Sequence, residues 1–381
     1  MSRGLRVALV AGEASGDFLG AGLMRALRER EPDVEFFGVG GREMEAAGLD
    51  SLFPMEHLSV MGLTEVLAHL PRLLRLRRQL IRAVLDWQPD IFVGIDSPDF
   101  NLPIAGRLHR RGITTAHYVS PTVWAWRRGR VKGIRRDIDH MLTLLPFEAR
   151  FYEDAGVPVT FVGHPMADRI PLETDASAAR RELGLEDGPL VALLPGSRRG
   201  EVERLLPDFL AAAEILHRRH PELGFVLPAA GPDRHREIAA ELERHPDVPV
   251  TLVEGQSRTA MAAADAVLLA SGTATLEGLL LKKPMVVGYR VGRLTYAILS
   301  RLVKTEWVAM ANLLLGEEQA PELIQDEFRP EAVAAALEYW LEHPDEAHRL
   351  AERYEAVHRQ LRRDASRRAA ETIEAVARDH G

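Results

Sequence analysis

Short apolar runs alternate with amphipathic segments along most of the chain. Apolar runs of this length are typical of strands buried on both faces, and amphipathic segments at helical spacing are typical of covering helices. The pattern predicts an α/β protein with two successive doubly wound parallel sheets. The expected strands are 5–11, 34–39, 90–95, 114–119, 140–145 and 157–162, then 190–194, 225–228, 248–253, 266–269 and 285–289; expected helices include 18–30, 200–220 and 273–281.

Length and local composition predict how the chain divides. Its 381 residues exceed the roughly 250 at which a single domain usually stops growing. Residues 165–187 are polar, loosely patterned and contain Pro171, which predicts a linker between domains. We therefore expect a first domain over 1–168 and a second over 169–343. The charged, amphipathic tail 344–381 is expected to be one long helix over 344–380.

Charge and cysteine content exclude several classes of protein. Lys and Arg total 48 against 56 Asp and Glu, a net charge of −8, which argues against a nucleic-acid partner. The absence of cysteine excludes disulfides and thiolate chemistry and fits a reducing compartment. No apolar stretch approaches the ~20 residues of a membrane span. Glu13 and Asp17 interrupt the N-terminal apolar run, so we expect no signal peptide and a cytoplasmic protein.

Small, polar, glycine-containing turns follow many of the expected strands. In doubly wound sheets, ligands bind beyond the carboxyl ends of the strands. A single turn of this kind also serves as an ordinary helix cap, but their recurrence predicts a lined cleft between the two domains. The turns are 12–17, 96–99, 120–122, 163–165, 195–198, 255–257 and 271–275.

Two of these turns are suited to phosphate. Residues 195–201 and 271–277 each follow a strand and open a helix, whose free N–H groups attract anions, and Arg198 adds a guanidinium group. Glu277 is placed to accept hydrogen bonds from a ribose, although a first-turn carboxylate also compensates the helix dipole. Neither turn matches a P-loop or GxGxxG motif, which favours a nucleotide-sugar. The candidate residues are Gly196, Ser197, Arg198, Gly255, Gln256, Ser271, Gly272, Thr273, Ala274, Thr275 and Glu277.

Asp96 is the candidate general base. It ends the strand 90–95, and a carboxylate at a strand mouth is suited to deprotonate a sugar hydroxyl; capping of the following turn is the alternative role. Residues 137–139 resemble a DxD metal motif but precede a strand, at the wrong edge of the sheet. His217 and His220 lie on an arginine-rich helical end without an acidic partner at ligand spacing. We therefore expect no metal.

Residues 58–85 combine apolar positions at helical spacing with a dense set of arginines. One interpretation is a helix pair that packs one face on the sheet. The other is a surface on anionic lipid, where each arginine adds ~1 kcal/mol. Spacing alone favours neither. The candidate membrane-contact residues are Val60, Met61, Arg72, Arg75, Leu76 and Arg78.

Several long motifs resemble those of the lipid-A-disaccharide synthases, a family of inverting glycosyltransferases with a GT-B-type fold. That fold has two Rossmann-like domains facing a central cleft and a C-terminal helix that crosses back to the first domain. The matching segments run in the family's order from about residue 5 to 330. They include VAGEASGD (10–17), SVMGLTEVL (59–67), GIDSPDFN (94–101), HYVSPTVWAWR (117–127), LLPFE (144–148), LLPGSR (193–198) and ASGTATLE (270–277).

The resemblance implies a reaction and a set of roles. The family joins the sugar of UDP-2,3-diacylglucosamine to the 6-hydroxyl of 2,3-diacylglucosamine 1-phosphate, releasing UDP and a β-1,6-linked disaccharide. It implies catalytic roles for Asp96, Arg198 and Asn312, although the proline that the family commonly has before the asparagine is missing here. UDP would bind the second domain, and the acceptor would lie near Glu13, Ser15, Asp17 and Ser120.

The resemblance also implies partners and a location. UDP-sugar is a substrate, and no cofactor or metal is expected. Acylated substrates imply peripheral association with the cytoplasmic face of the inner membrane, and this favours the lipid-surface interpretation of residues 58–85. A homodimer formed through the C-terminal helix is a further expectation.

Two other functions fit part of the pattern. A UDP-N-acetylglucosamine 2-epimerase has a related architecture, but it needs carboxylates on both faces of the sugar and no lipid-facing surface. A non-catalytic nucleotide-sugar or lipid-binding protein has no need of Asp96 at the acceptor side.

Overall fold

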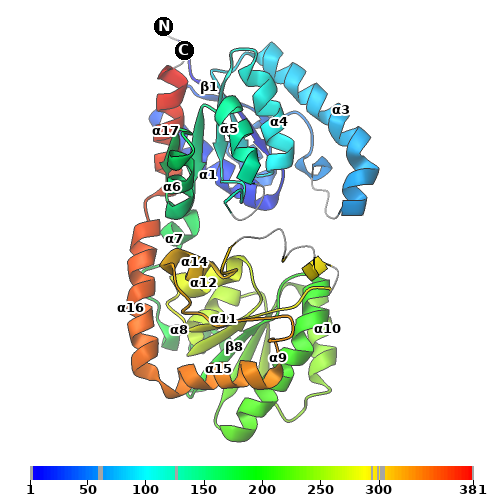
Figure 1. Cartoon of the computed structure of the whole chain (residues 1–381), viewed down its shortest axis with the longest axis vertical. Coiled ribbons are helices and arrows are strands. Elements are labelled where there is room, and N and C mark those ends of the chain that lie inside the picture. Colours follow the sequence, from blue (N-terminus) through cyan, green and yellow to red (C-terminus); the bar gives the residue numbers. More distant parts are fainter. Residues whose placement is uncertain are drawn as a thin grey trace. The chain divides into compact units, whose positions relative to one another are not determined.

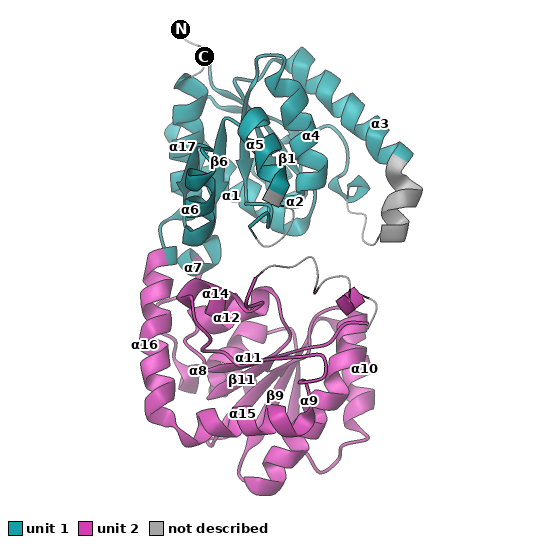
Figure 2. Ribbon diagram, viewed as in Figure 1, with its two compact units in different colours: residues 1–168, 361–381 teal, residues 169–360 magenta. Residues whose placement is uncertain are grey.

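The computed structural model describes residues 3–58, 63–124, 128–292, 295–297, 300 and 305–379; the side chains of 63–70 and of Arg128 are also outside the described set. The chain divides into two compact units (Figure 2). Unit 1 comprises Met1–Asp168 and Leu361–Gly381, and unit 2 comprises Arg169–Gln360. Each unit is built on one parallel sheet with covering helices, which confirms the predicted α/β class.

Unit 1 contains a parallel sheet of order β3-β2-β1-β4-β5-β6-β7. Its central strands β1, β4 and β5 are almost entirely buried because helices cover both faces, which explains their continuous apolar sequence. The strands are β1 (Arg6–Ala11), β2 (Glu35–Val39), β3 (Asp50–Ser51), β4 (Ile91–Ile95), β5 (Thr114–Tyr118), β6 (His140–Thr143) and β7 (Val159–Phe161).

Two layers of helices enclose this sheet (Figure 1). α1 and α17 pack together on one face, and α3, α4 and α5 lie on the other. Residues 63–87 form the single helix α3 rather than the helix pair that one interpretation of this stretch proposed. The helices are α1 (Ala14–Arg30), α2 (Arg42–Ala46), α3 (Leu63–Trp87), α4 (Pro98–His109), α5 (Val131–Asp137), α6 (Pro146–Asp154), α7 (Pro165–Arg169) and α17 (Ala365–Asp379).

Unit 2 contains a parallel sheet of order β10-β9-β8-β11-β12-β13. α9 packs with α15, and α11 packs with α8. The strands are β8 (Leu190–Leu194), β9 (Gly224–Ala229), β10 (Val250–Glu254), β11 (Ala266–Leu269), β12 (Met285–Tyr289) and β13 (Glu322–Ile324). The helices are α8 (Ala176–Leu183), α9 (Arg199–Arg219), α10 (Pro232–Leu242), α11 (Ser257–Ala263), α12 (Thr273–Leu280), α14 (Met310–Leu315), α15 (Pro330–Glu342) and α16 (Pro344–Leu361).

Residues 165–187 are not the unstructured linker that their composition predicts. They contain α7 and α8, and α8 begins at Asp175, whose carboxylate accepts a hydrogen bond from the Ala178 N–H at 2.9 Å. α8 ends at Gly184, where φ is +64°. The segment therefore contains a capped, two-turn helix, although its sequence lacks the strong apolar periodicity that predicts one.

The C-terminal tail is two helices rather than one. α16 belongs to unit 2 as far as Gln360, and α17 belongs to unit 1. The break is fixed by Asp168, whose carboxylate accepts hydrogen bonds from the N–H groups of Asp364 and Ala365 at 2.9 and 2.7 Å. These bonds satisfy N–H groups at the start of α17.

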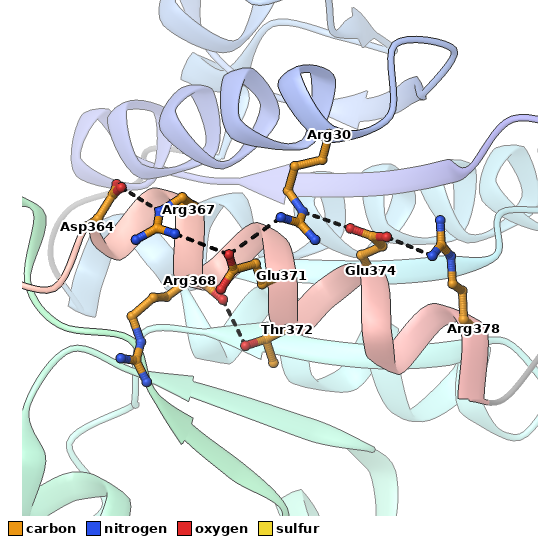
Figure 3. Close-up of polar contacts among 8 residues, drawn as sticks. All are labelled: Arg30, Asp364, Arg367, Arg368, Glu371, Thr372, Glu374 and Arg378. Atoms are coloured by element: carbon orange, nitrogen blue, oxygen red, sulfur yellow. Dashed lines mark hydrogen bonds and ion pairs between the residues drawn. The ribbon is translucent and has the colours of Figure 1, made fainter.

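Apolar packing and ion pairs hold α17 on unit 1. Ala369, Ala370 and Ile373 are completely buried. Figure 3 shows Glu374 between two arginines, Arg30 of α1 and Arg378 of α17, each 2.8 Å away. In the described part of the chain, no helix has both the length and the apolar content needed to cross a membrane.

Candidate active site

In unit 2, the turn after β8 leads into α9, whose N-terminus is suited to bind an anion. Gly196 has φ +115°, and a Cβ at this position would lie 2.6 Å from Oε2 of Glu201. Only glycine therefore fits here without a shift. Glu201 also accepts a hydrogen bond from the Arg198 N–H at 3.4 Å. The Arg198 side chain is 71% exposed, so it is accessible to a ligand. Its guanidinium group also lies 3.6 Å from the Glu201 carboxylate.

The turn after β11 is built in a similar way. Gly272 has φ +138° and precedes the first residue of α12, Thr273. Thr275 is completely buried, donates to the Gly272 carbonyl at 2.7 Å and accepts from the Met310 N–H at 3.0 Å. Thr275, a predicted nucleotide-sugar residue, therefore joins α12 to α14 through its hydroxyl group.

A pocket of about 370 Å³ lies at the carboxyl ends of β8, β9, β10 and β11. Most of the predicted nucleotide-sugar residues line it. The lining is Leu194, Gly196, Ser197, Arg198, Glu201, Pro228, Ala229, Ala230, Gly255, Ser257, Ala270, Ser271, Gly272, Thr273, Ala274 and Glu277.

The pocket differs from the prediction at several positions: Thr275 and Gln256 do not line it, and Leu194, Glu201 and Ala270 line it without having been predicted. Gln256 is exposed and outside the lining, and its neighbour Ser257 takes the expected place. The backbone at Gln256 is left-handed, with φ +56°, which reverses the chain before α11. Residues 228–230 were missed because the apolar end of β9 carries no polar signal in the sequence.

Glu277 lines this pocket and is held by an arginine. The Arg258 Nε lies 2.7 Å from Oε1 of Glu277. Arg258 comes from α11 and Glu277 from the second turn of α12. Sequence analysis singled out Glu277 but not Arg258, since one arginine among many gives no signal.

In unit 1, Asp96 stands at the carboxyl end of β4 in a tight turn. Asp96 and Ser97 both have left-handed backbones, with φ +50° and +43°. The Asn101 Nδ2 lies 2.9 Å from the Asp96 carbonyl oxygen, and 3.2 Å from those of Val10 and Ile95. Asn101 is completely buried, so it fixes this turn from the inside.

Burial raises the pKa of Asp96 above its usual range. Hydrogen bonds from the Ser97 N–H and the Ser15 hydroxyl oppose this shift by stabilising the carboxylate. A base with a raised pKa accepts a proton more readily, and these two donors stabilise its charged form. This is the electrostatic setting expected of a general base.

The residues predicted on the acceptor side divide into two groups. Glu13 and Ser15 are exposed at the start of α1. Asp17 is buried, and its carboxylate accepts hydrogen bonds from the N–H groups of Gly41, Glu43 and Met44 at 2.8 to 3.0 Å. Asp17 therefore anchors α2 from the interior of unit 1.

Ser120 belongs to a buried polar cluster. Its hydroxyl lies 3.1 Å from the Tyr152 hydroxyl, and Glu148 accepts a hydrogen bond from Trp124 Nε1 at 3.3 Å. Burial raises the pKa of Glu148 to about 7, and hydrogen bonds from Trp124, Leu145 and Ser120 limit the rise. Ser120, a residue predicted on the acceptor side, is thus buried within this cluster.

Asn312, the third residue predicted to be catalytic, is held in the interior of unit 2. It is completely buried, and its Nδ2 donates to the Ala320 carbonyl and to Glu322 at 2.8 and 2.9 Å. Its Oδ1 accepts from the N–H groups of Gln319 and Ala320, both at 2.8 Å. Both polar atoms of the amide are therefore used to hold the segment that leads into β13.

The arginine-rich helix α3 presents a groove of about 500 Å³. Arg75, Arg78 and Arg82 line it, and among the described residues none of the three pairs with a carboxylate. Arg72 is exposed as well. Leu76, a predicted membrane-contact residue, is half-buried and packs against the core of unit 1. Val60 and Met61 lie outside the described residues.

The two candidate metal motifs have other partners. Asp139 accepts hydrogen bonds from Thr115 at the amino end of β5, which is the edge opposite to Asp96. His220 does have an acidic neighbour, Glu338 at 3.0 Å, contrary to our expectation from spacing. Glu338 is also paired with Arg219 at 2.7 Å, so its charge is already neutralised.

Comparison with known proteins decides the family. A family model described as lipid-A-disaccharide synthetase matches residues 7–376. A relative in Alcanivorax borkumensis, named lipid-A-disaccharide synthase, is 61% identical over 368 residues, which cover 96% of each chain. The chain belongs to the lipid-A-disaccharide synthase family. It is therefore a glycosyltransferase. Another relative of the same name, from Pseudomonas syringae pv. tomato, is 58% identical and covers 98% of this chain and 97% of its own.

Solved structures of more distant proteins share the fold. A glycotransferase of kitacinnamycin has a TM-score of 0.65 at 19% identity, covering 98% of this chain and 100% of its own. A UDP-GlcNAc 2-epimerase from Neisseria meningitidis, bound to UDP-GlcNAc, has a TM-score of 0.64 at 12% identity and covers 97% and 100%. The GT-B-type fold is thereby confirmed. The fold alone does not distinguish a synthase from an epimerase, but the family membership does.

Proposed function

We propose that this chain transfers 2,3-diacylglucosamine from UDP-2,3-diacylglucosamine to the 6-hydroxyl of 2,3-diacylglucosamine 1-phosphate. The products are UDP and a β-1,6-linked lipid A disaccharide 1-phosphate. Family membership supports the reaction, and the pocket in unit 2 carries the assignment of the donor. It joins two helix N-termini, the Arg198 guanidinium and the Glu277 carboxylate around one space.

Each part of that pocket suits one part of a nucleotide diphosphate. The free N–H groups at the starts of α9 and α12 and the Arg198 guanidinium bind phosphate oxygens. Glu277 binds the ribose hydroxyls. As the bond between the anomeric carbon and the phosphate oxygen breaks, Arg198 and these N–H groups stabilise the growing charge on UDP. A metal ion is not required for this stabilisation.

Asp96 acts as the base on the acceptor. Its carboxylate takes the proton of the 6-hydroxyl as that oxygen attacks the anomeric carbon from the face opposite to UDP. The electron pair of the broken bond leaves with UDP, and the configuration at the anomeric carbon inverts. Ser15 donates a hydrogen bond to Asp96 from the start of α1. Ser15 and Glu13, which precedes α1, contribute to the acceptor side.

UDP release by the purified chain in detergent micelles tests this mechanism. We expect release that requires the acceptor, persists in EDTA and falls by ~100-fold or more in Asp96→Asn, the loss typical of a missing general base. Because the base must be ionised, kcat/KM rises with pH along an acid limb above the usual aspartate range. Release without acceptor, or full activity of the variant, would contradict the mechanism.

The groove on α3 supports contact with a membrane. Its three arginines outnumber the one carboxylate of the lining, Asp86, and this net positive charge suits the anionic cytoplasmic face of the inner membrane, where acylated substrates reside. Replacing Arg75, Arg78 and Arg82 with alanine should weaken binding to vesicles containing phosphatidylglycerol by on the order of 100-fold, at ~1 kcal/mol each. Alanine at Arg218, Arg236 and Arg244, exposed in unit 2, changes the net charge equally and should have little effect.

The oligomeric state follows from where α17 packs. We propose that two copies of the chain form a homodimer by exchanging α17. A short connection from α16 leads to this helix, which makes the exchange feasible. In this structure α17 packs on α1 of its own chain. Sedimentation velocity of the purified chain distinguishes the two states, and a monomer at all concentrations would contradict the exchanged dimer.

A further inference from the structure

An ion pair joins the two helices that border the nucleotide pocket of unit 2. Arg258 lies near the start of α11, directly after the turn at Gly255, and Glu277 lies on α12. The Arg258 Nε donates to Oε1 of Glu277 at 2.7 Å. Both Ser257 and Glu277 line the pocket, so the pair stands at its border.

The contact engages one carboxylate oxygen of Glu277 and leaves the other available. Among the described residues, no hydrogen-bond donor contacts Oε2 of Glu277. The Glu277 side chain is 15% exposed and the Arg258 side chain 45% exposed, so the carboxylate is the more enclosed partner. A partly enclosed carboxylate with one free oxygen directed by a fixed partner is a suitable acceptor for a sugar hydroxyl.

Charge balance gives Arg258 a second effect. The pocket also contains Glu201, and its proposed ligand carries a diphosphate. A carboxylate in such a pocket repels the ligand unless a cation compensates it. Arg258 compensates Glu277 from outside the lining, so the carboxylate can accept a hydrogen bond without adding a full negative charge.

We infer that Arg258 is a positioning residue for nucleotide recognition: it holds Glu277 so that the free carboxylate oxygen binds the ribose diol. Arg258 thereby sets the preference for a ribonucleotide over a 2′-deoxyribonucleotide. This inference rests on the proposed function of the pocket. The competing explanation is that the ion pair only fastens α11 to α12, in which case it affects both nucleotides equally.

Calorimetric titration with UDP and with 2′-deoxy-UDP separates the two explanations. The full chain is titrated as wild type, Arg258→Ala and Arg258→Lys. Arg218→Ala, which removes an exposed ion pair with Glu214 at the far end of α9, is the matched control. Glu277→Gln, alone and combined with Arg258→Ala, tests whether Arg258 acts through Glu277.

We expect the wild type and the control to prefer UDP over 2′-deoxy-UDP by roughly tenfold, the value of one hydrogen bond to a charged group. Arg258→Ala should lose most of this preference through weaker binding of UDP, and Arg258→Lys should recover part of it. In Glu277→Gln the preference is already lost, so adding Arg258→Ala should reduce it no further.

Other outcomes overturn the inference at distinguishable points. If both Arg258 variants kept the preference for UDP over 2′-deoxy-UDP, the ion pair would serve only to hold α11 against α12. A wild type that binds both nucleotides equally would exclude the ribose contact while leaving the UDP pocket intact. A folded wild type that binds neither would overturn the proposed function itself. If Arg258→Ala does not fold, Arg258→Lys and Arg258→Gln supply the same comparison.

Discussion

The turn that carries Asp96 is costly for its residues and is held from the interior. Two consecutive non-glycine residues, Asp96 and Ser97, adopt left-handed backbones, each at a cost of roughly 1–2 kcal/mol. The buried amide of Asn101 offsets this cost by binding the Asp96 carbonyl and the ends of β1 and β4. The position of the proposed base therefore depends on a residue that is itself completely buried.

Asn101→Ala should impair turnover more than binding of the donor. Loss of the amide frees the Asp96 turn, and we expect kcat to fall by on the order of tenfold or more, because a misplaced base loses much of its effect. The KM for the UDP-sugar should change little, since the donor pocket lies in unit 2. Steady-state kinetics measure both values. Arg107→Ala, an exposed position on the same helix α4, serves as control; a purely structural Asn101 would alter KM and kcat together.

Glu148 makes the stability of unit 1 depend on pH. Burial raises the pKa of Glu148 from 4.5 to about 7 in the folded chain. Folding therefore favours the protonated carboxyl group. Its contribution to the free energy of unfolding is fully present below pH 4.5 and is lost as the pH rises through about 7. Glu148→Gln should be more stable than wild type at pH 8, by on the order of 2 kcal/mol, and similar at pH 5.

Urea unfolding of unit 1 at the two pH values, followed by the fluorescence of its tryptophans, measures this difference. Glu153→Gln, an exposed position on the same helix α6, should show no such pH dependence. An equal effect of Glu148→Gln at both pH values would show that the carboxyl group does not titrate between them.

At the scale of elements, the strands were the most predictable part. β8, β11 and β12 fall where the apolar runs predict them, because a strand covered on both faces needs an unbroken apolar sequence. β3 and β13 are too short to form such a run and were missed. The break after α16 was also missed, since residues 361–365 contain no proline or glycine and a remote carboxylate, Asp168, supplies the cap.

The candidate site was predicted to a similar degree and for related reasons. Glycine turns mark where a backbone meets a ligand, so Gly196 and Gly272 were identified from spacing. The direction of a polar side chain depends on the tertiary fold, which the sequence pattern does not contain. For this reason the sequence does not show that Asp17, Thr275 and Asn312, all predicted in the candidate site, are buried and bonded to backbone groups.

The ion pairs of α17 should differ in strength along the helix. Glu374 has an 11% exposed side chain and contacts Arg30 and Arg378, both at 2.8 Å, whereas Glu371 is 40% exposed with contacts at 3.5 Å. Glu374→Gln should therefore lower the free energy of unfolding of unit 1 by about 1–2 kcal/mol. Glu371→Gln, three residues earlier on the same helix, should cost less than ~0.5 kcal/mol. Equal losses in urea unfolding would contradict this ranking (Figure 3).

For the whole molecule, unit 1 is assembled from both ends of the chain. Residues 1–168 supply the sheet, and the last residues, from Leu361, return to cover the face that α1 shares with α17. The chain of unit 2 is continuous. The two units therefore have separate hydrophobic cores, and damage to one core should leave ligand binding by the other intact.

Ile373→Asp tests this independence. Ile373 is completely buried on the inner face of α17. An aspartate there places an unpaired charge in the core of unit 1, at a cost of about 3 kcal/mol or more. Hydrogen exchange read by mass spectrometry should show faster exchange throughout unit 1, while UDP still protects the turns after β8 and β11. The reciprocal change, Leu337→Asp in the buried face of α15, should accelerate exchange in unit 2 and abolish that protection. If Ile373→Asp also removed UDP protection, the donor pocket would depend on the packing of α17, and the two cores would form one cooperative structure.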